Sequence, residues 1–208
     1  VVEAADPNAP VIVLFMQVHA RPEGAENVKT EKASQNSTTK KGISNFAKKK
    51  KTEAESQLAI YEHVEALIEA GVGSTLYEEF LPEYMKLSEK GAAGIIESQP
   101  RFEGAAALEL KLDLGEDIVV RCYDNDELKA YLLNGGGDFL HRLTSANVYL
   151  ASNLASIHPG RDEQPVSFVT IGGLHEQYPK KRVKHQIPAS YAMAYYGFNV
   201  IVVNQAFN

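Results

Sequence analysis

Five short and almost continuously apolar runs, separated by segments with helical spacing, set the strongest limit on what this chain can fold into. The runs occupy residues 11–18, 74–80, 116–124, 166–173 and 198–205. Continuous apolar runs that are rich in β-branched residues are typical of strands covered on both faces. Strands that alternate with helices along a chain favour a parallel arrangement. The sequence therefore predicts an α/β fold, in which a mainly parallel, open sheet carries helices on both faces.

Between these runs the apolar residues follow the spacing of a helix. The clearest case is 56–71, where apolar residues recur every three or four positions and Gly71 follows as a typical C-terminal residue. Helix signals of the same kind, with Asp138 suited to be an N-cap, predict four further helices at 82–91, 126–133, 138–157 and 188–197.

Residues 23–54 differ from the rest of the chain. They are poor in large apolar residues and rich in Lys, Ser, Thr and Asn, and no periodicity runs through them. We interpret them as a long loop excursion. The four lysines at 48–51 are more typical of a solvated loop than of a polyanion site, because no aromatic or apolar face accompanies them. With 208 residues, of which 44% are hydrophobic, we expect a single α/β domain spanning 1–208 with this lysine-rich excursion at about 23–54.

Charge and composition restrict the partners. The chain has 27 acidic and 21 basic residues and a formal net charge of -6, which argues against nucleic acid as a partner. A small-molecule or peptide substrate is expected only from the family resemblance described below. No apolar run approaches the roughly 20 residues that a membrane span needs. The chain begins with Val1, as it would after trimming or after removal of a secretion signal. We favour the second explanation and expect an exported or cell-envelope protein. Cys122 is the single cysteine, and we expect a packed thiol.

Ionisable side chains follow four of the five predicted strands. They are His19, the adjacent acids Glu78 and Glu79, Asp124, and His175 with Glu176. Ligands collect at the carboxyl ends of parallel strands, so we expect these side chains to line one crevice. Two imidazoles with one or two carboxylates form a suitable ligand set for a divalent transition metal, which would acidify a bound water. A buried histidine with a purely structural role would give the same local pattern.

The last of these strand ends has a special form. Gly172 and Gly173 stand between the apolar run and His175 in the stretch "FVTIGGLH". Because glycine adopts backbone conformations that other residues avoid, we expect the pair to turn the chain at the edge of the sheet. The turn would direct the imidazole of His175 into the crevice.

The segments "VIVLFMQVH", "SQLAIYEHVEAL", "TLYEEF", "FLHRLTSANVYLASNLASI" and "FVTIGGLH" together resemble the TraB/PrgY/Tiki superfamily, which is related to the ChaN-like haem-binding lipoproteins and the erythromycin esterases. Carried over to this chain, the resemblance implies a site formed by His19, Glu78, Arg142 and His175, with Gln57 and Glu79 as further candidates. The chain departs from the first GxxH motif of that superfamily, because Met16 stands where glycine is usual.

The resemblance implies a metal-dependent hydrolase that acts on an amide, peptide or ester. His19, Glu78 and His175 would hold a divalent transition metal, while Glu78, Glu79 and Arg142 would act on the substrate. The alternative is a non-catalytic protein of ChaN-like type, in which His19 and His175 contact haem or another ligand. An inactive member of the superfamily is the third alternative.

Overall fold

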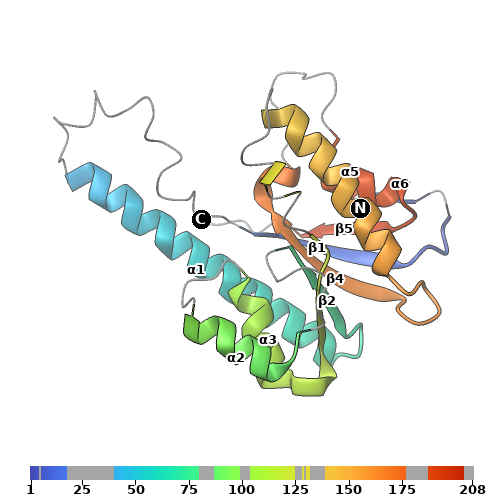
Figure 1. The fold of residues 1–208 in the computed structure, drawn as a ribbon, viewed down its shortest axis with the longest axis horizontal. Helices are drawn as coiled ribbons and strands as arrows, with labels where there is room; N and C mark the ends of the chain where they lie inside the picture. Colours follow the sequence, from blue (N-terminus) through green and yellow to red (C-terminus); the bar gives the residue numbers. More distant parts are fainter. Residues whose placement is uncertain are drawn as a thin grey trace.

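The computed structural model describes residues 1–4, 6–17, 40–79, 87–98, 104–124, 128, 130–131, 139–176 and 187–203. Within these residues the chain forms five strands, which are β1 (Val11–Gln17), β2 (Thr75–Glu78), β3 (Val119–Cys122), β4 (Val166–Gly172) and β5 (Asn199–Val203). The same residues contain five α-helices, which are α1 (Lys40–Glu69), α2 (Glu89–Ser98), α3 (Ala105–Leu114), α5 (Phe139–Ile157) and α6 (Ala189–Tyr195) (Figure 1).

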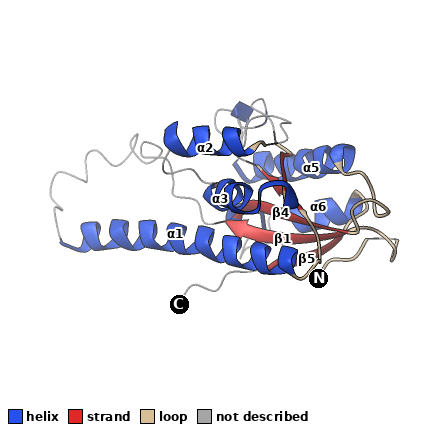
Figure 2. Ribbon diagram, turned by 90° about the horizontal axis from the view of Figure 1, so that it is seen from below, coloured by secondary structure: helices blue, strands red, loops and turns tan. Residues whose placement is uncertain are grey.

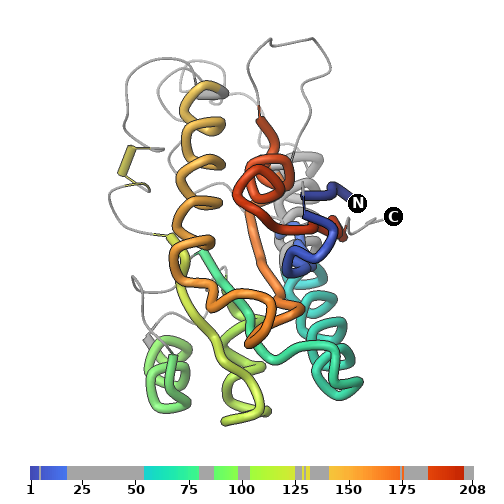
Figure 3. Tube along the Cα trace, turned by 90° about the vertical axis from the view of Figure 1, so that its right-hand side faces the viewer, coloured from blue at the N-terminus to red at the C-terminus, as the bar shows by residue number. Residues whose placement is uncertain are grey.

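The strands form one open sheet in the order β3-β2-β4-β1-β5, and every pair of neighbours is parallel. The predicted α/β class is confirmed, and the described sheet is all-parallel rather than mainly parallel. From β1 the chain moves out to β2 and β3, returns to β4 in the centre, and finally adds β5 on the far side. The N-terminal segment runs beside β5, where Val2 exchanges backbone hydrogen bonds with Val200 (Figure 3).

Helices cover both faces of the sheet, as the sequence predicts. Alternate residues of β1 point to opposite faces, so Val13 and Phe15 belong to one buried cluster, while Ile12 and Leu14 belong to the other. The first cluster packs under α1, α2 and α3, and we call this side the α1 face. The second packs under α5 and α6, on the side that we call the α5 face (Figures 1 and 2).

The helix α1 corrects the prediction for the lysine-rich excursion. We expected a loop over 23–54 and a helix over 56–71, but the helix begins at Lys40 and continues to Glu69. Residues 40–54 are therefore helical, while 18–39 lie outside the described residues. Lysine, alanine and glutamate favour a helix intrinsically, even where no apolar stripe marks one face. None of the helices in the described part of the chain is long and apolar enough to cross a membrane.

The region between β2 and β3 also differs from the prediction. We expected one helix at 82–91, whereas the chain forms α2 at 89–98 and then α3 at 105–114. Residues 80–86 lie outside the described residues. Of the helix expected at 126–133, residues 128, 130 and 131 are described and are helical. The helices expected at 138–157 and 188–197 are confirmed as α5 and α6, although α6 ends at Tyr195.

Candidate functional site

The carboxyl ends of the strands lie at one edge of the sheet because the strands are parallel. At this edge Gln17 ends β1 and lies opposite Gly172, which ends β4. Glu78 ends β2 and lies opposite Cys122 of β3. Glu78, Glu79 and Asp124 lie at or just beyond this edge, and all three are buried.

Glu78 is the centre of a buried hydrogen-bond network on the α1 face. Only 1% of its surface is exposed. The side-chain amide of Gln17 donates to both carboxylate oxygens, with Nε2 at 2.8 Å from Oε1 and 3.0 Å from Oε2. The hydroxyl of Thr170 donates to Oε2 as well. Because residues two apart in a strand share a face, Gln17, Glu78 and Thr170 lie on the same side as Phe15, Leu76 and Phe168.

Two glutamines connect this carboxylate to the helices. Gln57 of α1 donates through Nε2 to Oε1 of Gln17 at 2.8 Å. Its own Oε1 accepts the backbone N–H of Ala106, in the first turn of α3, at 3.0 Å. The structure thus brings Gln57, a candidate from the family resemblance, to Glu78 through Gln17. The sequence analysis missed Gln17, although a signal was present: it is the single polar residue in the run 11–18 and would need a hydrogen-bond partner when buried.

Glu79 lies on the α5 face, because neighbouring residues at the end of a strand point to opposite sides. Its Oε1 accepts the backbone N–H of Gly172 at 2.9 Å. Glu79 also lies close to Tyr123, whose hydroxyl donates to the carbonyl of Thr170 at 2.8 Å. Burial raises the pKa of Tyr123 well above its ordinary value, and the negative charges of Glu79, Glu78 and Asp124 raise it further. The tyrosine is therefore a neutral hydrogen-bond donor at physiological pH.

His175 lies in a short 3₁₀ turn, η3 (Gly173–Glu176), that follows β4 directly. Its side chain is buried, with 8% exposed, and Nδ1 is hydrogen-bonded to Oδ1 of Asn147 in α5. The amide group of Asn147 has a fixed orientation, because Nδ2 donates to the carbonyls of His175 at 3.1 Å and Ile187 at 2.7 Å. Since Oδ1 can only accept, Nδ1 of the imidazole must be the donor. In the neutral ring the lone pair is therefore on Nε2.

Gly173 allows the turn to pack against the end of β1. A β-carbon at this position would lie 3.2 Å from the carbonyl oxygen of Gln17 and 3.8 Å from Cε of Met16. A side chain here would push the turn away from the strand. The expected reason is wrong, because neither Gly172 nor Gly173 adopts a positive φ. The requirement for glycine at 173 comes from this close approach instead.

The remaining residues that the sequence analysis singled out are His19, Arg142, Asp124 and Cys122. His19 lies outside the described residues. Arg142 is in α5 and is half-buried. The backbone carbonyl of Asp124 accepts the thiol of Cys122, with Sγ at 3.4 Å. Cys122 is a buried free thiol, as predicted. Among the residues that the structure describes, no group of three or more His, Cys, Asp or Glu is arranged to hold a metal ion.

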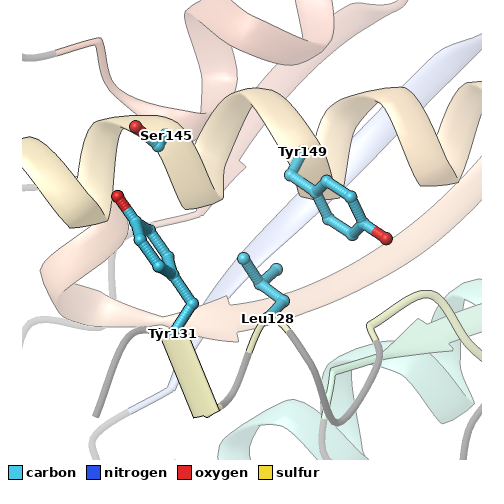
Figure 4. Close-up of a pocket in the computed structure, with 4 residues that line it drawn as sticks. All are labelled: Leu128, Tyr131, Ser145 and Tyr149. Atoms are coloured by element: carbon cyan, nitrogen blue, oxygen red, sulfur yellow. The ribbon is translucent and has the colours of Figure 1, made fainter. Parts of the chain in front are cut away.

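A shallow depression of about 260 Å³ lies beside α5. Leu128, Tyr131, Ser145 and Tyr149 line it, and Figure 4 shows Ser145 and Tyr149 on the helix above Leu128 and Tyr131. The two tyrosines are 40% and 39% exposed. These four side chains offer neither a carboxylate nor an imidazole, so the depression has no ligand of the predicted metal site.

The strand order and the parallel pairing of all neighbours define this protein as an α/β protein with a five-stranded, all-parallel open sheet. In comparisons with known proteins, no family model, no curated protein and no solved structure matches the chain. The resemblance to the TraB/PrgY/Tiki superfamily therefore stays a prediction from the sequence.

Proposed function

We propose that this chain is a metal-dependent hydrolase of TraB/Tiki type, which acts on an amide, peptide or ester. The hydrogen bond between His175 and Asn147 is the observation that supports this activity. A histidine that binds a metal through one ring nitrogen typically donates its other N–H to a fixed acceptor, which sets the tautomer and the ring orientation. Asn147 provides such an acceptor, and it leaves the lone pair of His175 on Nε2.

The ligands in this proposal are Nε2 of His175, the carboxylate of Glu78 and the imidazole of His19. His175 fits a ligand role because of its tautomer, and Glu78 fits because Gln17 and Thr170 hold its carboxylate in one orientation. A bound divalent ion would supply a water of lowered pKa and polarise the carbonyl of the substrate.

The protein itself would contribute charge and position. The guanidinium of Arg142 would stabilise negative charge that develops on the carbonyl oxygen of the substrate, because Arg is permanently cationic. Glu79 would fix the strand end beside the site, since it accepts the backbone N–H of Gly172 just before the turn that carries His175.

Calorimetric titration with Zn²⁺ tests the proposal, on the parent protein and on two variants, His175→Ala and Asn147→Ala. We expect His175→Ala to abolish binding. Asn147→Ala should weaken binding about 10- to 100-fold, since loss of the residue that orients a ligand typically has this effect. Two matched controls, His63→Ala and Asn153→Ala, should bind as the parent does. His63 is exposed on α1, and Asn153 of α5 donates to the carbonyl of Tyr123 at 3.3 Å.

Thermal melts of the same proteins separate a ligand from a structural histidine. If His175→Ala lowers the melting temperature but binds Zn²⁺ as the parent does, His175 is structural and the proposal is wrong. If the parent itself binds no divalent ion but gives a visible absorption band with haem that His175→Ala loses, the ChaN-like alternative replaces the hydrolase.

A further inference from the structure

Arg121 of β3 carries the one buried side-chain nitrogen or oxygen that has no hydrogen-bond partner among the residues that the structure describes. This atom is Nε of its guanidinium group. The side chain as a whole is half-buried, and within the described part of the chain it forms neither a hydrogen bond nor an ion pair. A guanidinium group is permanently charged and can only donate. Because an unpaired donor at a buried position costs stability, this one calls for an explanation.

The strand places Arg121 on the α5 face, at the outer edge of the sheet. β3 is the last strand on its side, so β2 is its one neighbouring strand. In that pair Arg121 lies opposite Tyr77, which belongs to the buried cluster of the α5 face. Tyr123, two residues further along β3, belongs to the same cluster, as the alternation along a strand requires. The side chain of Arg121 therefore leaves the sheet on the side of α5, where no further strand flanks it.

The groups next to Arg121 on this face are neutral. Burial raises the pKa of Tyr77 to about 12, and the positive charge of Arg121 acts against this rise. The hydroxyl of Tyr77 is thus uncharged, and it donates to Oε1 of Gln164 at 3.0 Å. The helix α5 contains no acid from Phe139 to Ile157. It passes the end of β3, where Asn153 donates to the carbonyl of Tyr123 at 3.3 Å.

Acids are present near Arg121 but do not pair with it. Those within four positions of Arg121 or of Tyr77 along the two strands are Glu78, Glu79, Asp117 and Asp124. None of them forms an ion pair with Arg121. Their negative charges lower the positive potential around the guanidinium group, which weakens the binding of a phosphate dianion more than that of a singly charged carboxylate.

We propose that Arg121 anchors a ligand with a free carboxylate at the outer edge of β3. The Nε–H and a terminal N–H of a guanidinium group form a fork, and its spacing matches the two oxygens of a carboxylate. Such a ligand would give the buried N–H an acceptor and the guanidinium group a countercharge. The site goes beyond the proposed function, because it needs no metal ion and uses none of the proposed metal ligands.

NMR of the Nε–H groups in the full chain tests the proposal at neutral pH. The signal of Arg121 is assigned by its loss in Arg121→Met. We expect sodium acetate to shift this signal until it saturates. Acetamide, which has nearly the same shape but no charge, and sodium chloride at equal ionic strength should leave the signal in place, and inorganic phosphate should bind more weakly than acetate. The absence of a saturable shift, or tighter binding of phosphate than of acetate, would overturn the proposal.

Thermal melts with matched variants give a second readout. Acetate at ten times its dissociation constant should raise the melting temperature of the parent by about 3 to 6 °C above sodium chloride at equal ionic strength. Arg121→Met removes the charge, whereas Arg121→Lys keeps the charge but loses the fork, so both should lose most of this rise.

Arg161→Met is the matched control, because Arg161 is exposed and its Nη1 donates to the carbonyl and to Oδ1 of Asn8 at 2.7 and 3.0 Å. We expect acetate to raise the melting temperature of this variant as it does that of the parent. An undiminished rise in Arg121→Met would show that acetate acts elsewhere and would overturn the proposal. Zn²⁺ titration decides the proposed function separately, so either proposal can fail while the other stands.

Discussion

His158 should make the stability of this protein fall between neutral and mildly acidic pH. Burial lowers the pKa of this histidine from 6.5 to about 4. The ring packs between Tyr77 and Phe198, with centroid distances of 6.0 and 5.2 Å. Its Nδ1 accepts the backbone N–H of Gly160 at 3.1 Å, so Nε2 carries the proton and can donate to the hydroxyl of Ser167 at 3.1 Å. Protonation of Nδ1 would set two donors against each other.

The direction of the effect follows from where the proton binds. Below pH 6.5 the unfolded chain protonates this imidazole, whereas the folded protein does so only near pH 4. Stability rises with pH wherever the unfolded state binds more protons, so the contribution of His158 is complete above pH 6.5 and is lost as the pH falls toward 4. The difference between 6.5 and about 4 corresponds to about 3 kcal/mol at 1.36 kcal/mol for each pH unit. Because the ring is only half-buried and solvent screens its charge, we expect roughly 1 to 2 kcal/mol.

Urea unfolding of the parent and of His158→Gln at several pH values measures this term. Glutamine keeps a donor and an acceptor at the position but does not titrate. The difference in the free energy of unfolding between parent and variant should therefore shrink by roughly 1 to 2 kcal/mol from pH 7 to pH 4. His63→Gln, which removes an exposed imidazole, is the control for loss of a histidine as such. Parallel pH profiles for parent and His158→Gln, or an NMR titration of His158 near pH 6.5, would refute the reasoning.

Two further changes test the packing that supports the edge of the sheet. Gly73→Ala should lower the free energy of unfolding by about 1 to 3 kcal/mol in urea melts, because the new β-carbon would lie 2.7 Å from the carbonyl oxygen of Val166; a parent-like melt would contradict this. Lys111→Met should lower the free energy of unfolding by about 1 to 3 kcal/mol. The buried Nζ of Lys111 donates to the carbonyl of Ile118 at 3.0 Å, and this carbonyl would lose that donor. The exposed Lys90→Met is the control, and equal melting temperatures of the two lysine variants would show that the buried ammonium adds no stability.

The architecture could be predicted from the sequence because burial on both faces leaves a direct mark on a strand. β1 and β4 lie in the interior of the sheet between two helical layers, and each is an almost unbroken apolar run. The lysine-rich first part of α1 left no such mark. A helix that shows no apolar stripe has no period by which it can be recognised, so 40–54 looked like a loop.

The site could be predicted in part. Parallel strands predict that Glu78, Glu79 and Asp124 reach one edge, and that is where they lie. The partner of His175 could not be predicted, because Asn147 precedes it by 28 residues and meets it only where the turn after β4 packs on α5. A contact of this kind depends on how a helix is docked, which leaves no local pattern in the sequence. Gln17, by contrast, could have been found from its isolation in an apolar run.

The adjacent acids Glu78 and Glu79 have different surroundings, although the sequence presents them as a pair. Glu79 accepts the backbone N–H of Gly172, a bond that a further residue of β2 would otherwise provide, so its carboxylate extends the edge of the sheet by one hydrogen bond. Glu78 faces the other side and accepts side-chain donors from Gln17 and Thr170. Side chains can be rearranged or exchanged without breaking a strand, whereas the backbone of Gly172 cannot. The bonds from Gln17 and Thr170 to Glu78 can therefore be changed by substitution while the backbone bond at Gly172 stays intact.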